Sequence, residues 1–285
     1  MIRQPVVAGT FYPNDSAELR AYVTAALATD RPAEPAFGLV APHAGYIYSG
    51  AVAGAVFSRV QIPDRVLLLG PNHTGAGTPA SIVSSGAWAT PLGEVPIDTP
   101  LANALLAACP LLQEDARAHA REHSLEVQLP FLQVQNPQVY IVPIAFQLRR
   151  AEEILQVGQA VATVLRAWQQ PVLVVASSDM THYESQAEAA RKDGLAIDRL
   201  LAVDAAGLLA TVRDHHISMC GVIPAAILLT AAAACGAHQA ELVRYATSGD
   251  TSGDYRQVVG YAGVRLTAPP MDKRANGKKN QDGAE

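Results

Sequence analysis

The sequence is poor in charged and in aromatic side chains. Of its 285 residues, 16% are charged and 6% are aromatic, and the formal net charge is −5. A nucleic-acid-binding surface needs an excess of lysine and arginine, often with aromatic side chains between them, because it must neutralise phosphates. No such basic stripe occurs in the chain. No nucleic-acid partner is therefore expected.

Cysteine and long apolar runs are also scarce. Three cysteines, an odd number in a chain of this length, do not make the framework of paired cysteines found in small secreted domains. The most apolar stretch, residues 222–236, contains Pro224 and is shorter than the roughly 20 residues that span a bilayer. Residues 1–10 lack the apolar core of a signal peptide. A soluble, cytoplasmic protein with no membrane partner is expected.

The chain does contain enough apolar material for one large core. Hydrophobic residues make up 49% of it, and no linker rich in Pro, Gly or Ser separates two self-contained apolar patterns. Several strand-like segments are uninterrupted apolar runs, which is typical of strands buried on both faces. We predict a single α/β domain over residues 1–268, with a central mixed, largely parallel sheet flanked by helices. Residues 269–285 are polar and are expected to be disordered.

The same patterns predict the individual elements. Strands are expected at residues 37–41, 65–69, 81–84, 139–146, 171–176, 242–246 and 259–266. Helices are expected at residues 16–28, 49–59, 100–108, 124–133, 151–168 and 222–234, with one or two more within 187–212. Residues 85–98 indicate an irregular or hairpin excursion.

Three histidines lie just beyond predicted strands. They are His43, His73 and His182. Because the carboxyl ends of strands in an open α/β sheet border one crevice, these side chains can converge on one site. Histidine there indicates a metal or a proton-transfer centre, and His43 and His73, each followed by a glycine, fit metal ligation through neutral imidazole. The alternative for each is a hydrogen bond to a loop carbonyl.

Asp179 and His182 lie three residues apart after the strand at residues 171–176. A carboxylate near an imidazole raises its pKa and selects its tautomer, which suits a general acid or base. The alternative is that Asp179 caps the following helix and His182 packs on that helix.

His123 stands in a segment, Glu122 to Gln128, that predicts the start of an amphipathic helix. On that helix His123, Glu126 and either Glu122 or Gln128 could face the same cleft. The alternative for the two glutamates is a solvated acidic first turn, which the helix dipole favours.

Cys220 precedes the predicted helix at residues 222–234. A helix N-terminus lowers the pKa of a thiol and favours the thiolate, which binds metals or attacks electrophiles. Cys109 and Cys235 lie at alanine-rich helix ends, where a small buried apolar residue is the default.

Taken together, these segments resemble one known family. The segments that carry the resemblance read A-P-H-A-G-Y, G-P-N-H, E-H-S-L-E-V-Q-L-P, S-S-D-M-T-H-Y, M-C-G and T-S-G-D. The chain is similar to the Memo family, whose prokaryotic members are called AmmeMemoRadiSam system protein B. The resemblance implies a fold shared with class III, LigB-type extradiol dioxygenases, which use non-haem iron. It also places His43, His73 and Cys220 as metal ligands, with His123, Asp179 and His182 in the surrounding pocket.

Three functions follow as hypotheses. The first is a redox enzyme in which His43, His73 and Cys220 hold Fe(II), with Cu or Zn as possible metals because a thiolate replaces the usual carboxylate. In it, His182 exchanges a proton while Asp179 or His123 orients it. The second is a non-catalytic module that binds a small molecule, a peptide or a partner protein; the prokaryotic name implies a radical-SAM partner. The third is hydrolysis by zinc-bound water or by Cys220 as nucleophile.

Overall fold

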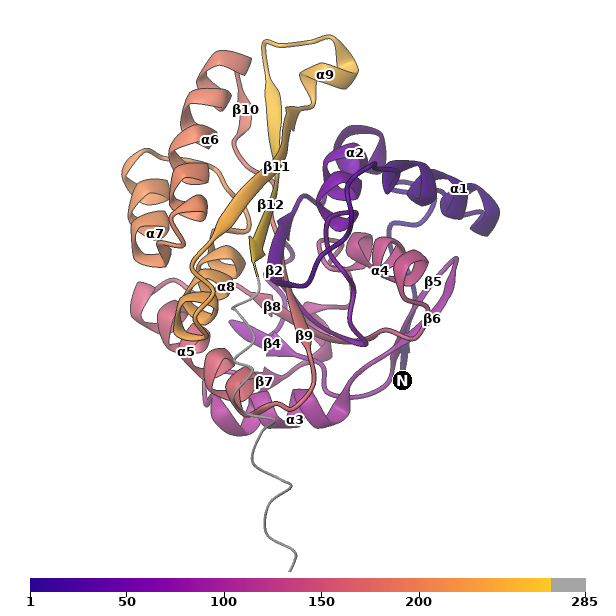
Figure 1. Ribbon diagram of the computed structural model, residues 1–285, viewed down its shortest axis with the longest axis vertical. Helices are drawn as coiled ribbons and strands as arrows, with labels where there is room; N and C mark the ends of the chain where they lie inside the picture. The colour runs from indigo at the N-terminus through magenta and orange to yellow at the C-terminus, as the bar shows by residue number, and fades with distance from the viewer. Residues whose placement is uncertain (268–285) are drawn as a thin grey trace, which may run out of the picture.

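A computed structural model describes residues 1–267, and the tail at 269–285 lies outside the described residues (Figure 1). Its centre is a nine-stranded sheet with the order β10-β12-β2-β9-β3-β8-β4-β7, in which β11 pairs with β12. The strands are β2 (Ala36–Ala41), β3 (Arg65–Pro71), β4 (Ala80–Ile82), β7 (Gln113–Glu114), β8 (Tyr140–Phe146), β9 (Val172–Ser177), β10 (His182–Glu184), β11 (Ala240–Thr247) and β12 (Val258–Thr267).

The four central strands, β2, β9, β3 and β8, are parallel to one another. Antiparallel pairs flank them, with β12 against β2 on one side and β4 against β8 on the other. The predicted mixed sheet flanked by helices is therefore confirmed.

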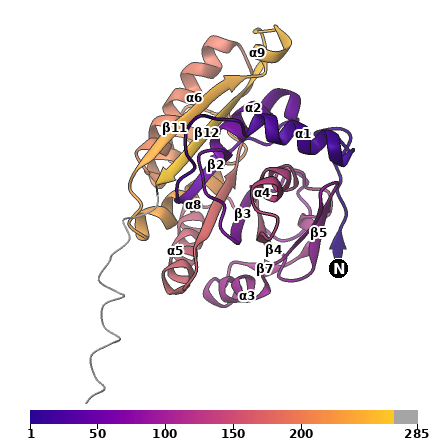
Figure 2. The same ribbon diagram turned by 45° about the vertical axis from the view of Figure 1, so that its right-hand side comes forward.

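Helices cover both faces of this sheet (Figures 1 and 2). Successive residues of β3 alternate between two cores: Leu67 and Leu69 belong to one, Val66 and Leu68 to the other. Since side chains of a strand point to opposite faces in turn, this explains why the central strands are continuous apolar runs. The first core is covered by α3 (Thr99–Ala108), α5 (Ala151–Ala167), α6 (Gln186–Leu201), α7 (Ala205–Asp214) and α8 (Val222–Ala234); the second by α1 (Ser16–Ala26), α2 (Tyr46–Phe57) and α4 (Leu129–Gln135).

A second, three-stranded sheet holds the beginning of the chain. It consists of β1 (Ile2–Arg3), β5 (Ala87–Thr90) and β6 (Gly93–Pro96), with β1 parallel to β5. The hairpin of β5 and β6 corresponds to the excursion predicted at residues 85–98.

The predicted start of the helix at residues 124–133 is wrong. The chain is irregular up to Leu125, makes a short 3-10 turn over Glu126–Gln128, and only then enters α4. Pro130 lies in the first turn of α4, the one place in a helix where its missing N–H costs nothing. Glu122 and His123 therefore lie in a loop. We call residues 119–126 the histidine loop.

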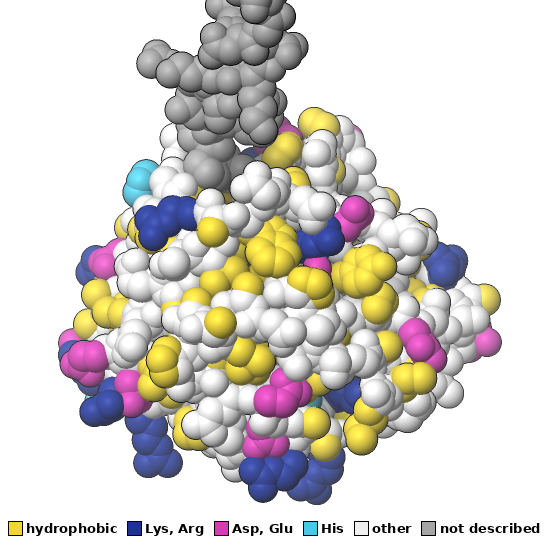
Figure 3. All heavy atoms as spheres, turned by 90° about the horizontal axis from the view of Figure 1, so that it is seen from below, with side chains coloured by type: hydrophobic (Ala, Val, Ile, Leu, Met, Phe, Trp, Pro, Cys, Tyr) yellow, Lys and Arg dark blue, Asp and Glu magenta, His cyan; other side chains and the backbone are white. Residues whose placement is uncertain are grey.

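One further difference concerns a short strand. Strand β10 at His182–Glu184 was not predicted, because its residues contain no apolar run and it is defined by its pairing with the remote strand β12. Within residues 1–267, no helix is both long and apolar enough to cross a membrane. On the face drawn in Figure 3, charges of both signs are scattered over the described surface without a basic stripe; the absence of a nucleic-acid partner stays a prediction.

Candidate metal centre

The ends of three adjacent parallel strands bring the site together. His43 comes two residues after β2, His73 two residues after β3, and Asp179 two residues after β9, which lies between them. The register pairs Ala41 with Ser177, so these strand ends lie at one edge of the sheet. The predicted convergence of His43 and His73 is what the parallel sheet produces.

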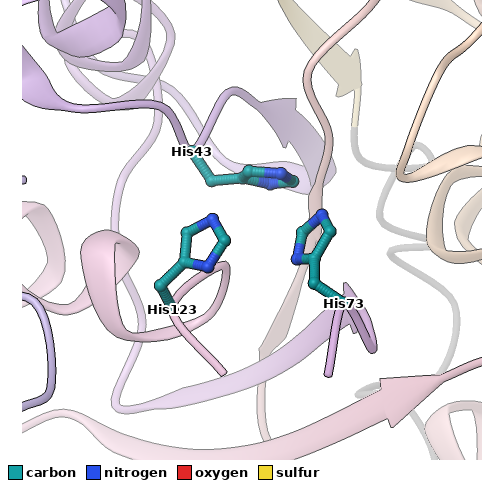
Figure 4. A group of neighbouring side chains, drawn as sticks. All are labelled: His43, His73 and His123. Carbon is teal, nitrogen blue, oxygen red and sulfur yellow. The ribbon is translucent and has the colours of Figure 1, made fainter. Parts of the chain in front are cut away.

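A third histidine completes the group. His123, from the histidine loop, faces His43 and His73, and one ring nitrogen of each of the three lies within 4.8 Å of the others (Figure 4). The ring of His123 stacks on that of His73 at a centroid distance of 4.8 Å, and His43 stands edge-on to both. His43 is 2% exposed and His73 34%, so the group reaches from the interior to the surface.

Ser177 selects the tautomer of His43. Its Oγ lies 2.7 Å from the carbonyl oxygen of Ser124, which can only accept, so the hydroxyl hydrogen goes there. Ser177 Oγ must then accept from His43 Nδ1 at 2.8 Å, and it accepts also from Gln128 Nε2 at 2.9 Å. This leaves the Nε2 lone pair of His43 unprotonated, which is the state of a metal-binding imidazole.

Glu122 does the same for His73. One carboxylate oxygen lies 2.9 Å from His73 Nδ1, and the other accepts the backbone N–H of His73 at 2.6 Å. Burial alone would raise the pKa of Glu122, but these bonds outweigh it and lower the pKa to about 2. A carboxylate there keeps the Nδ1 hydrogen of His73 in place and leaves Nε2 free.

Burial keeps the other two imidazoles neutral. It lowers the pKa of His43 well below the usual histidine range, and the nearby His73 and His123 add to the effect. Burial likewise lowers the pKa of His123. Neutral imidazole is the form that binds a metal, so His43 and His123 need no deprotonation at neutral pH.

Cys220 lies against His43 on the opposite side from Ser177. Its Sγ is 3.1 Å from His43 Nε2 and accepts the backbone N–H of Asp179 at 3.3 Å. Burial, together with the charge of Asp179, raises the pKa of this thiol. The expectation that the start of α8 would lower that pKa is therefore wrong, because desolvation outweighs the helix dipole.

Asp179 and His182 are arranged differently from the prediction. Asp179 Oδ1 accepts the backbone N–H of His43 at 2.7 Å, and Oδ2 lies 3.9 Å from His43 Nε2. His182 is tied to Ser218 instead: its Nδ1 lies 3.0 Å from the Ser218 carbonyl oxygen. Within residues 1–267 no hydrogen bond joins Asp179 to His182. Burial raises the pKa of Asp179.

The two alternatives based on helix starts are also corrected. Asp179 does not cap the following helix, since Ser185 is the residue that caps α6. Glu122 and Glu126 are fully buried, so they do not form a solvated first turn. Glu126 instead accepts hydrogen bonds from Arg3, from Tyr12 and from the backbone of Val6 and Val7.

The sequence pattern does not predict the role of three supporting residues. Ser177 holds His43, Gln128 in turn donates to Ser177 and to the carbonyl oxygen of Pro42, and Glu122 holds His73. Their signal was adjacency: Ser177 opens the segment that contains Asp179, and Glu122 precedes His123. Nothing in the spacing, however, shows which histidine each one contacts.

The fold and the site together define a mixed α/β protein with a histidine cluster at the carboxyl edge of its central parallel strands. The family model described as "Memo-like protein" matches residues 3–265. The chain belongs to the Memo family.

Similar proteins come from distant organisms. A MEMO1 family protein of Methanopyrus kandleri is 43% identical, over 93% of this chain and 98% of its own. A MEMO1 family protein of Aquifex aeolicus is 42% identical, over 92% of this chain and 98% of the Aquifex protein. Among solved structures, an uncharacterized protein from Escherichia coli K12 gives a TM-score of 0.47 at 12% identity, over 73% of this chain and 88% of the other.

Proposed function

We propose that the chain is a non-haem metal protein in which His43 and His73 bind Fe(II) and Cys220 supplies the third donor. The observation that carries the proposal is the state of the two histidines, whose Nδ1 hydrogens are committed to Ser177 and Glu122. Histidine ligands are typically held in this way, through the nitrogen that does not face the metal.

The donors fit a metal in number and chemistry. Nitrogen donors that share one metal lie at most about 4.2 Å apart, twice a typical bond length of roughly 2.1 Å. The ring nitrogens of His43 and His73 lie within 4.8 Å of each other, so the two ligands need only small side-chain rotations to reach this. The 3.1 Å contact of Cys220 Sγ with His43 Nε2 puts a potential thiolate beside the same nitrogen. Metal binding would release the thiol proton despite the raised pKa of Cys220.

The side chains around the donors have roles of their own in an oxidoreductase. A bound iron supplies one-electron chemistry that no side chain provides. His123, neutral and 23% exposed, is placed to take a proton from a ligand that enters beside His73. His182, whose Nδ1 donates to Ser218, offers its Nε2 as a second proton acceptor. Asp179 holds the backbone of His43 and orients the ligand.

Metal content and two variants test the ligand set. Protein purified without oxygen should contain about one iron per chain by elemental analysis, and much less in His43→Ala. Cys220→Ser should lose a sulfur-to-metal absorption band in the cobalt-substituted protein, whereas His123→Gln should keep both the band and the metal. The reverse result, with metal lost in His123→Gln and retained in Cys220→Ser, would replace the proposed set by three histidines. Zinc in place of iron would remove the redox part of the proposal, because zinc has no redox chemistry, whereas copper would change only the identity of the metal.

A partner-binding role for the same face is the second candidate. Large apolar side chains are exposed on segments next to the site: Ile47 at 70%, Tyr183 at 73% and Tyr255 at 49%. Exposed apolar groups in a cluster are typical of interaction surfaces. The partner would be a peptide or a protein, for which a radical-SAM protein is the candidate. Co-purification that survives His43→Ala but is lost in Tyr183→Ser would favour this role.

A further inference from the structure

A cleft lies on the outside of α2, and none of its lining residues belongs to the histidine cluster. It has a volume of about 290 Å³ and is bordered by the end of α1, the outer side of α2 and β11. Ligand pockets usually measure roughly 300 to 1,000 Å³, so this one suits a small ligand. Small side chains line part of it, among them Ala26, Ala51 and Ala55.

Three arginines from three separate segments line the cleft. Arg31 follows α1, Arg59 follows α2, and Arg244 lies on β11. The single carboxylate among the lining residues is Asp30, which leaves an excess of two positive charges. Arg31 and Arg244 are exposed, and neither makes an ion pair with another described residue.

Arg59 is the least expected member of the group. It is only 9% exposed, and its Nε is buried without a hydrogen-bond partner among the described residues. Its Nη2 lies 3.4 Å from Glu241 Oε1, but that oxygen is shared with Arg265, whose Nε is 3.1 Å away. A buried guanidinium with an unused donor is unfavourable unless something accepts from it.

We propose that this cleft binds a small phosphoryl anion, of the size of pyrophosphate or a compact phosphate monoester. Guanidinium groups match phosphate oxygens in pairs, and several of them converging on one anion make charge-assisted hydrogen bonds. No aromatic side chain lines the cleft to stack on a base, so a compact anion fits better than a nucleotide. Such a ligand would add a charge partner for Arg59, whose carboxylate partner Glu241 is already shared with Arg265.

Calorimetric titration of the full-length protein with pyrophosphate tests the proposal. The protein is first treated with a chelator, so that the anion cannot bind through a metal. We expect saturable binding of one pyrophosphate per chain. Arg31→Gln and Arg244→Gln change exposed side chains, and each should weaken the affinity by about tenfold, the loss of one charge-assisted hydrogen-bonding group. Inorganic phosphate should bind more weakly than pyrophosphate.

Arg166→Gln is the matched control. Arg166 is also exposed and makes no ion pair with a described residue, but it lies at the end of α5, outside the cleft. Equal weakening in Arg166→Gln would show a general charge effect and overturn the proposal, as would the absence of saturable binding at about 10 mM pyrophosphate, an affinity weaker than roughly 3 kcal/mol. Tighter binding of citrate than of pyrophosphate would assign the cleft to carboxylates instead.

Discussion

The two halves of the candidate metal centre are built in different ways. The strand half, with His43, His73 and Asp179, follows from the register of three parallel strands. The loop half, the histidine loop with Glu122 and His123, has no regular structure where these two residues lie. Instead, the guanidinium of Arg3 donates to the carbonyl oxygens of His119 and Glu122 and to the carboxylate of Glu126. One half is thus placed by the sheet, and the other by the first residues of the chain.

The two halves differ in how much a single substitution can disturb them. A strand end is supported by a whole ladder of backbone hydrogen bonds, so one side chain changes it little. The histidine loop depends on individual side-chain bonds, and the Arg3 side chain makes three of them, among them the ion pair with Glu126 at 2.7 Å, whose side chains are 11% and 0% exposed.

Arg3→Ala should do the most damage. It leaves Glu126 buried without its charged partner, which typically costs about 3 to 5 kcal/mol of unfolding free energy. The freed loop should also lose its hold on His73 and His123, so metal affinity should fall. Chemical denaturation and a chelator competition measure the two effects. Arg191→Ala, which breaks an exposed pair with Glu188, is the control and should cost less than about 1 kcal/mol. Similar losses in both variants would contradict the role of Arg3.

Acid should weaken the loop half through His119. This residue is buried, and burial lowers its pKa to about 4 from the usual 6.5. The folded chain therefore holds the neutral form, and its stability falls as pH drops from 6.5 towards 4, by up to about 3 kcal/mol at roughly 1.4 kcal/mol per pKa unit. In His119→Gln this part of the pH dependence should disappear. Unfolding curves of the metal-free protein between these pH values would show it, and parallel curves for both proteins would refute it.

Ser177→Ala probes the strand half. It removes the acceptor for His43 Nδ1, and loss of such a partner usually weakens metal binding about 10- to 100-fold. Stability should fall by only about 1 to 3 kcal/mol, because the strand itself remains. Ser58→Ala, which removes the hydroxyl bond to Ala55, should lower stability while metal affinity stays unchanged. An unchanged metal affinity in Ser177→Ala would mean that the hydrogen bond does not orient His43.

Tyr183→Gly should change the stability least, and it should raise the stability where the other variants lower it. Tyr183 has a φ of 60°, in the left-handed region that a bulky residue rarely adopts. Glycine relieves this strain, so stability should rise by about 1 kcal/mol. Tyr183→Ala keeps the strain and should not be stabilised. Thermal unfolding of the two variants distinguishes them, and equal stabilities would rule out backbone strain at this position.

The same contrast separates what the sequence could predict from what it could not. Uninterrupted apolar runs identify β2, β3, β8 and β9, and a histidine after two such strands predicts a shared edge. The tautomer of each histidine depends on which acceptor bonds its Nδ1. Ser177 reaches His43, and Glu122 reaches His73, only in the folded chain.

The histidine loop shows the limit most clearly. Glu122 and Glu126 have the spacing of one α-helical face, yet Glu122 lies in a loop bonded to His73, and Glu126 opens a 3-10 turn and pairs with Arg3. Cys220 shows a second limit, because its position at the start of α8 indicates a lowered pKa while its burial reverses the direction. Local patterns miss both effects, since the partners are remote in sequence.

The pairing of β12 with β2 sets the time at which the site can form during synthesis. Leu266 lies opposite Gly38, so the strand that leads to His43 gains its neighbour on one side only when nearly the whole described chain has been made. Contacts between such remote segments form slowly and late. The edge of β2 that β12 covers therefore stays unpaired until residues 258–267 have been made.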